Sequence, residues 1–150
     1  PAPMPLHARP RRRSALGLVV ILALTSLTLT ACPNVELANR MVEMVNAERT
    51  SRGLPALTID AEATAKAEAW ADHLASIQTL EHSNLPDGFT TWWNYLGENV
   101  AFASTLEGTH TALMNSAGHR ANILATRFTS IGIGVVEQDG VVWVTQVFRG

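Results

Sequence analysis

The feature that most constrains this chain is its single cysteine, Cys32, which lies where an apolar leader meets the rest of the sequence. One thiol cannot form an internal disulfide. Any domain that follows must therefore be held together by core packing and hydrogen bonds. About 119 residues remain after residue 31, which is enough for one compact domain and too few for two. The sequence predicts one domain without disulfides.

Residues 1–31 have the order of a secretory leader: a basic patch at residues 9–13, an apolar run from about residue 15, then small residues before Cys32. The apolar run is short for a membrane span. Its last four residues, Leu-Thr-Ala-Cys, resemble the bacterial lipobox. That resemblance implies that Cys32 carries a lipid such as palmitate and becomes the mature N-terminus. The alternative is an ordinary signal peptide and a secreted protein.

We therefore expect a leader over 1–31, an anchored N-terminus with a short linker over 32–36, and a domain over 37–150. The expected location is extracytoplasmic, with the membrane as a partner through the lipid on Cys32. The leader holds four of the eleven basic residues and no acidic residue. The remainder then has seven basic against thirteen acidic residues, a net charge of −6. An acidic domain without a basic cluster argues against binding to nucleic acid.

Hydrophobic periodicity predicts two long helices in the first half of the domain. The stretch "PNVELANRMVEMVNAERTSRGL" carries an apolar stripe, and Gly53 is typical of a helix end. Asp60 is a good N-cap for "AEATAKAEAWADHLASIQTL", whose alanines indicate close approach to a neighbouring layer. Asn46 and Arg49 lie on the less apolar side of the first helix, where we expect them to anchor loops by hydrogen bonds.

The second half reads as an irregular segment, two helices and a hairpin. Residues 81–102 lack periodicity. The Ser-x-x-Glu pattern at 104–107 predicts the capping box of a third helix, and Ser116 is expected to cap a short helix, "AGHRANIL", with its side chain. Asp139-Gly140, between two β-branched runs, predicts a hairpin turn. The fold class expected is α+β, with helices flanking a small antiparallel sheet.

Three polar residues stand out: His82 and Glu98 in the irregular segment, and His119 in the first turn of the short helix. Two histidines and a carboxylate, if the fold brings them together, can hold Zn²⁺ or another divalent metal with a position left open for water. The alternative is a buried polar network in which Glu98 accepts from an imidazole and Asn99 holds the loop backbone. Spacing alone leaves both possibilities open.

Several stretches of the chain also resemble the bacterial branch of the CAP superfamily, which comprises cysteine-rich secretory proteins, antigen 5 and pathogenesis-related proteins and is defined by the SCP domain. The stretches are "VNAERTSRGLPAL", "HS" at 82–83, "GENVA", "NSAGHRANIL", "FTSIGIGVV" and "WVTQVF", in that order. The resemblance runs from about residue 37 to residue 148. It implies an α-β-α sandwich with a central cleft.

The resemblance also implies a set of cleft residues. Eukaryotic members have two histidines and two glutamates in the cleft. Here His82, Glu98 and His119 match three of them, whereas Ser116 stands where the second glutamate belongs and Leu113 replaces the tryptophan of the Trp-x-x-Glu motif. The tetrad implied for this chain is His82, Glu98, Ser116 and His119.

Other polar and aromatic residues are further candidates for the site. Ser116 could act as a nucleophile, although the N-cap role fits it better. Arg120 could bind an anionic ligand or, as we favour, pair with a carboxylate of the domain. His73 and His110 are expected to be solvated. The remaining candidates to line a ligand are aromatic: Trp92, Trp93 and Tyr95.

Three functions follow from this reading. The first is a lipid-anchored binding module whose cleft holds a small apolar or glycan-like ligand, such as cell-wall material, with a divalent metal on His82 and His119 and, as a third candidate ligand, Glu98. The second is a metal-assisted hydrolase of cell-envelope material or protein, with Glu98 as general base. The third is a scaffold or adhesion domain. The missing second carboxylate favours the first and third.

Overall fold

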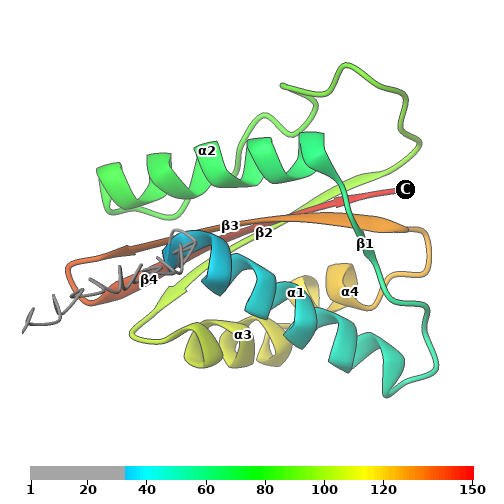
Figure 1. Ribbon diagram of the computed structural model, residues 1–150, viewed down its shortest axis with the longest axis horizontal. Coiled ribbons are helices and arrows are strands. Elements are labelled where there is room, and N and C mark those ends of the chain that lie inside the picture. Colours follow the sequence, from blue (N-terminus) through cyan, green and yellow to red (C-terminus); the bar gives the residue numbers. More distant parts are fainter. Residues whose placement is uncertain (1–32) are drawn as a thin grey trace, which may run out of the picture.

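The computed structural model describes residues 33–150, which form three layers (Figure 1). One helix, α2 (Ala61–Ile77), covers one face of a four-stranded sheet. The other helices contact the sheet from the opposite face: α1 (Pro33–Thr50), α3 (Leu106–Asn115) and α4 (Ala117–Ile123). This is the α-β-α sandwich expected, without disulfides. The expected leader and the lipid site at Cys32 lie outside the described residues.

The first helix is fixed to the rest of the domain by polar side chains as well as by its apolar face. α1 ends at Thr50, shortly before Gly53, and Met41 and Val45 are fully buried. Asn46 exchanges hydrogen bonds with the backbone of Leu57. Arg49 is 1 % exposed and donates to four carbonyl groups, those of Pro55, Ile123, Ala125 and Phe128. The loop-anchoring roles predicted for Asn46 and Arg49 are confirmed.

The helix α2 lies almost directly on the sheet. Asp60 caps it as predicted, its Oδ1 accepting from the Ala63 backbone at 2.8 Å. A Cβ atom placed on Gly132 or Gly134 would lie 2.0 Å from the α2 backbone. Two glycines in a strand therefore allow the close approach that the alanines of α2 indicated.

The sheet has the order β1-β3-β4-β2. Its strands are β1 (Thr58–Ile59), β2 (Leu96–Ala103), β3 (Ser130–Gln138) and β4 (Val141–Arg149). β2, β3 and β4 pair antiparallel as expected, but β1 is parallel to β3, so the sheet is mixed. Asp139 and Gly140, with φ of 53° and 75°, form the predicted hairpin turn.

Four local predictions for the second half were wrong. Residues 96–102 lie in strand β2 and are not irregular. Most residues of this strand are buried on both faces of the sheet. The sequence therefore lacks the alternation of apolar and polar residues by which a half-exposed strand is recognised. The N-cap of α3 is Thr105, whose side chain accepts from Gly108, one residue after the serine predicted. Ser116 occupies the N-cap position of α4 but makes no side-chain cap bond. His110 is 7 % exposed, because it lies on the α3 face turned towards α1.

The main apolar core lies between the sheet and the layer of α1, α3 and α4. Its members include Met41, Val45, Leu113, Ile123, Phe128, Ile131, Ile133, Val144 and Phe148. None of the helices in residues 33–150 has the length and apolar character needed to span a bilayer.

Candidate functional site

The candidate site lies at the free edge of the sheet. β2 pairs with β4 alone, so its other side is an edge. Neighbouring residues of a strand point to opposite faces; Glu98 therefore lies on the α2 side and Asn99 on the α4 side. His82 reaches Glu98 from the segment after α2, and His119 comes from the first turn of α4. The edge strand thus joins groups supplied from both layers.

Glu98 is a buried carboxylate whose two oxygens are both occupied. It is 7 % exposed. Its Oε1 accepts from His82 Nδ1 at 2.7 Å and from the backbone N–H of Ser83 at 2.9 Å. Its Oε2 accepts from Ser83 Oγ at 2.6 Å. These bonds clamp the chain at residues 82–83 onto β2, as the polar-network alternative of the sequence analysis expected.

The same contact determines how His82 is presented. An ionised carboxylate only accepts hydrogen bonds, so Nδ1 of His82 is the donor. In the neutral ring, Nε2 then carries the lone pair. The side chain of His82 is 61 % exposed while that of Glu98 is 3 % exposed. The pair therefore turns a free imidazole nitrogen towards solvent.

His119 completes the pair of imidazoles. Burial lowers the pKa of His119 below its ordinary value, and the charge of His82 lowers it further. The second cause shows that the two rings lie within electrostatic reach of each other. Both effects favour the neutral ring, the form that binds metals. Ser116, the fourth tetrad residue, is partly buried and its hydroxyl makes no cap bond.

A network of amide side chains on the opposite face of β2 holds α4 in place. Asn99 Nδ2 donates to the His119 carbonyl at 3.1 Å and to Gln146 Oε1 at 3.0 Å. Asn122 Nδ2 donates to Asn99 Oδ1 at 3.0 Å and to the Glu98 carbonyl at 3.3 Å. Asn99 does bond a backbone group, but that group is the His119 carbonyl in α4 and not the loop backbone that the polar-network alternative expected. The sequence analysis did not predict a role for Gln146. An amide side chain within an otherwise apolar strand nevertheless indicates a buried hydrogen bond.

The residues of the tetrad could offer a metal ion at most two imidazoles, and not three ligands. Among residues 33–150, no group of three or more His, Cys, Asp or Glu side chains could hold a metal. Glu98 accepts hydrogen bonds from His82 and Ser83. Its role is therefore to orient the His82 ring and not to act as a further metal ligand. This arrangement matches the carboxylate that commonly orients a metal-binding histidine. These residues are compatible with a weak metal site whose remaining coordination positions are filled by water or by a bound ligand. They are not compatible with a zinc site that has three protein ligands.

The aromatic candidates lie in the segment that leads into β2 and at its end. Trp92 and Trp93 line a surface hollow with Phe89, Thr90 and Thr91. Tyr95 is 53 % exposed, and the guanidinium of Arg127 lies 6.0 Å from its ring.

Arg120 does not have the role expected of it. Its Nη1 donates to the Met114 carbonyl at 2.8 Å, near the end of α3, and it pairs with no carboxylate of residues 33–150.

Comparisons with known proteins bear on this geometry. The model of the cysteine-rich secretory protein family (CAP) matches residues 42–148. The uncharacterized protein YkwD of Bacillus subtilis is 38 % identical over 120 residues, which are 74 % of this chain and 46 % of that protein. This chain thus spans under half of that relative's length.

Solved structures show the same fold. An extracellular protein from Bacillus anthracis that contains an SCP domain matches with a TM-score of 0.69 and 24 % identity, over 77 % of this chain and 41 % of that one. A structure described as NaASP2 with Zn²⁺ matches with a TM-score of 0.58 and 17 % identity, over 79 % of this chain and 83 % of that one. At these identities the likeness concerns the fold.

Proposed function

This chain belongs to the cysteine-rich secretory protein (CAP) family, and from that premise we propose that it is an extracytoplasmic binding module and not a hydrolase. The observation that carries this proposal is the set of three hydrogen bonds that Glu98 accepts from residues 82–83. Both oxygens of that carboxylate accept hydrogen bonds from residues 82–83. A general base must lie within hydrogen-bond reach of the proton that it removes, whereas these bonds direct both oxygens of Glu98 to residues of its own chain. Glu98 instead fixes the direction of His82.

The group that faces a ligand is then the imidazole pair. His82 is exposed while its Nδ1 donates to Glu98, and burial lowers the pKa of His119, which favours the neutral ring that binds metals. We propose that the two rings bind a divalent cation such as Zn²⁺, whose remaining positions are filled by water or by an oxygen-bearing ligand. The Zn²⁺ named for the related fold of NaASP2 supports this choice of probe. Bound there, the cation would supply positive charge for ligand binding.

Zinc titration of the purified protein tests the proposal. We expect calorimetry to show weak Zn²⁺ binding that His82→Ala and His119→Ala each reduce by roughly tenfold or more, because each removes one of two ligands. His73→Ala is the matched control, since His73 also pairs with a glutamate, at 2.9 Å from Glu81, but is not one of the tetrad residues. Equal zinc affinity in all four proteins would overturn the proposed site.

The lipid anchor is a separate proposal that depends on the lipobox resemblance. The Bacillus anthracis relative of this fold is described as extracellular, which agrees with a secretory leader. We expect Cys32→Ser to release the protein from the membrane fraction into the medium when it is expressed in a bacterium. Unchanged fractionation of that variant would contradict anchoring through Cys32.

A further inference from the structure

Trp92 is the most exposed of the large hydrophobic side chains in residues 33–150, at 83 %. It belongs to the loop between α2 and β2. An indole left in water forgoes the stabilisation that burial would give. A single exposed apolar side chain is common, whereas a contiguous exposed apolar patch marks a binding surface. The loop around it shows whether this exposure is accidental.

The loop is held from beneath by Glu62 in the first turn of α2. Glu62 accepts from the backbone N–H and hydroxyl groups of both Thr90 and Thr91. These bonds, those of Thr90 first, lower the pKa of Glu62 to about 2, so the carboxylate stays ionised at any physiological pH.

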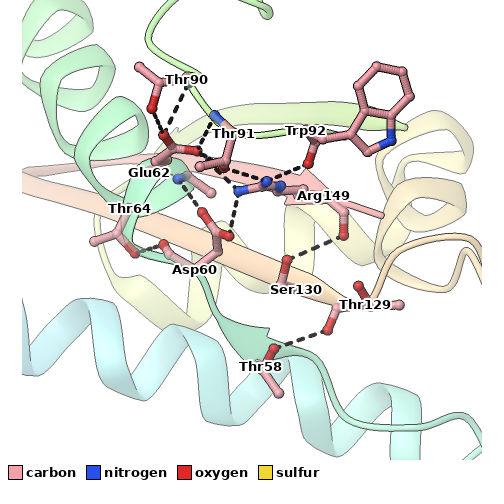
Figure 2. Close-up of polar contacts among 11 residues, drawn as sticks. Thr58, Asp60, Glu62, Thr64, Thr90, Thr91, Trp92, Thr129, Ser130 and Arg149 are labelled. Carbon is pink, nitrogen blue, oxygen red and sulfur yellow. Dashed lines mark hydrogen bonds and ion pairs between the residues drawn. The ribbon is translucent and has the colours of Figure 1, made fainter. Parts of the chain in front are cut away.

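A second clamp comes from Arg149 at the end of β4. Its guanidinium lies 2.8 Å from Asp60 and 3.2 Å from Glu62, and donates to Thr91 Oγ1 and to the Trp92 carbonyl. Figure 2 shows the carbonyl of Trp92 turned to Arg149 and its indole directed away from this network.

The indole is therefore displayed by an ordered backbone. Further along, the N–H groups of Asn94 and Tyr95 both donate to the Gly150 carbonyl, at 2.7 and 2.9 Å. A loop that is fixed before binding loses little conformational entropy on binding. An exposed aromatic ring on such a loop has the properties of a preformed binding surface.

The hollow beside Trp92 has a volume of about 560 Å³ and is lined by aromatic rings and hydroxyl groups: Phe89, Thr90, Thr91, Trp92 and Trp93. Its lining includes none of the four tetrad residues. Both threonine hydroxyls donate hydrogen bonds to Glu62. The Thr91 hydroxyl also accepts one from Arg149, so an acceptor for a ligand comes mainly from the Thr90 hydroxyl. Flat apolar faces beside a hydroxyl acceptor suit a ligand that is itself apolar on one face and hydroxylated at its rim.

We propose that this hollow, between Phe89 and Trp93, is a second binding site, for neutral pyranose sugars such as those of a polysaccharide. A pyranose ring presents C–H groups to an aromatic face and hydroxyls around its edge, which matches the lining. Arg149 is flanked by two carboxylates, Asp60 and Glu62, so the surroundings carry no net positive charge for an anionic sugar. The domain's net charge of −6 beyond the leader likewise disfavours docking on an anionic membrane.

Calorimetric titration with neutral oligomers of N-acetylglucosamine, glucose and mannose tests this site. We expect at least one oligomer to bind, and Trp92→Ala to weaken its binding by roughly tenfold, since the stacking face is lost. Glu62→Ala leaves the indole in place but frees the loop, and is expected to weaken binding several-fold. Phe102→Ala is the control, because Phe102 is another exposed aromatic residue, on β2.

The outcomes separate this site from the cation site. His82→Ala should leave the affinity for the oligomer unchanged even where it abolishes Zn²⁺ binding. The proposal is overturned if none of the three oligomers binds at millimolar concentration, or if Trp92→Ala binds as tightly as the unchanged protein. Binding to lipid vesicles that depends on Trp92, without binding to any oligomer, would also overturn it and would assign the loop to a membrane.

Discussion

Two imidazole–carboxylate pairs in this protein have opposite arrangements. In the His82–Glu98 pair the carboxylate is buried, at 3 % side-chain exposure, the imidazole is 61 % exposed, and the two lie 2.7 Å apart. In the His110–Glu48 pair the imidazole is 9 % exposed, the carboxylate is 31 % exposed, and the distance is 3.8 Å. A buried carboxylate presents its histidine to solvent, whereas a buried histidine is itself a part of the packing. The residue type alone does not distinguish a binding histidine from a structural one.

The largest effect is expected from removing the buried member of the first pair. Glu98→Ala should destabilise the protein by about 1–3 kcal/mol, because three hydrogen-bond donors at residues 82–83 lose their acceptor. Urea unfolding measures this loss. A stability equal to that of the unchanged protein would show that Glu98 does not clamp the loop.

The second pair should appear in the pH dependence of stability. Burial is the main cause that lowers the pKa of His110 in the folded state; the charge of Glu48 and its hydrogen bond oppose it. The unfolded chain therefore takes up a proton at a higher pH than the folded one. The stabilisation is complete above the unfolded value of about 6.5 and declines as the pH falls from there, by at most about 1.4 kcal/mol per pH unit for one site.

His110→Gln should remove that part of the decline. Unfolding free energies of the variant and the unchanged protein at pH 7.5 and pH 5.5 provide the comparison. If both proteins lose stability equally between these two values, His110 is not the titrating group.

His82→Ala should cost less than Glu98→Ala, by about 1 kcal/mol or less, although it removes the same contact. The exposed imidazole contributes one hydrogen bond, and Ser83 still satisfies Glu98. Thermal unfolding of the two variants side by side measures the difference. A cost for His82→Ala equal to that for Glu98→Ala would make the two members of the pair equivalent and contradict the asymmetry described above.

The smallest effect is expected from a third pair, His73–Glu81. Its members are 39 % and 51 % exposed at 2.9 Å, so solvent screens the interaction. Glu81→Ala should change the free energy of unfolding by about 0.5 kcal/mol or less, as measured by urea unfolding. A loss as large as that of Glu98→Ala would mean that burial of the carboxylate does not set the strength of these pairs.

Much of the fold was predictable because its signals are local. The stop near Gly53, the Asp60 cap and the Asp139-Gly140 turn each depend on a few neighbouring residues, and each is present. Strand β2 was missed because burial on both sides hides its period. His110 was misplaced because α1, more than sixty residues earlier in the chain, covers its face of α3.

The site was predictable in its members more than in their roles. Family resemblance pointed to His82, Glu98 and His119, which the fold does collect at the edge of β2. Sequence spacing could not show that Glu98 orients His82 through a hydrogen bond, because that bond depends on how residues 82–83 pack against β2. The clamp on the Trp92 loop was equally out of reach, because Arg149 and Glu62 are 87 positions apart.

The central claim is that Glu98 holds His82 with Nε2 towards solvent. Nitrogen-15 NMR of the imidazole rings at pH 8 tests it most directly, with His82→Ala to assign the resonances. The predicted result is a neutral His82 ring protonated at Nδ1, whose unprotonated Nε2 resonance shifts when Zn²⁺ is added. A ring protonated at Nε2, with Nδ1 free, would contradict the account.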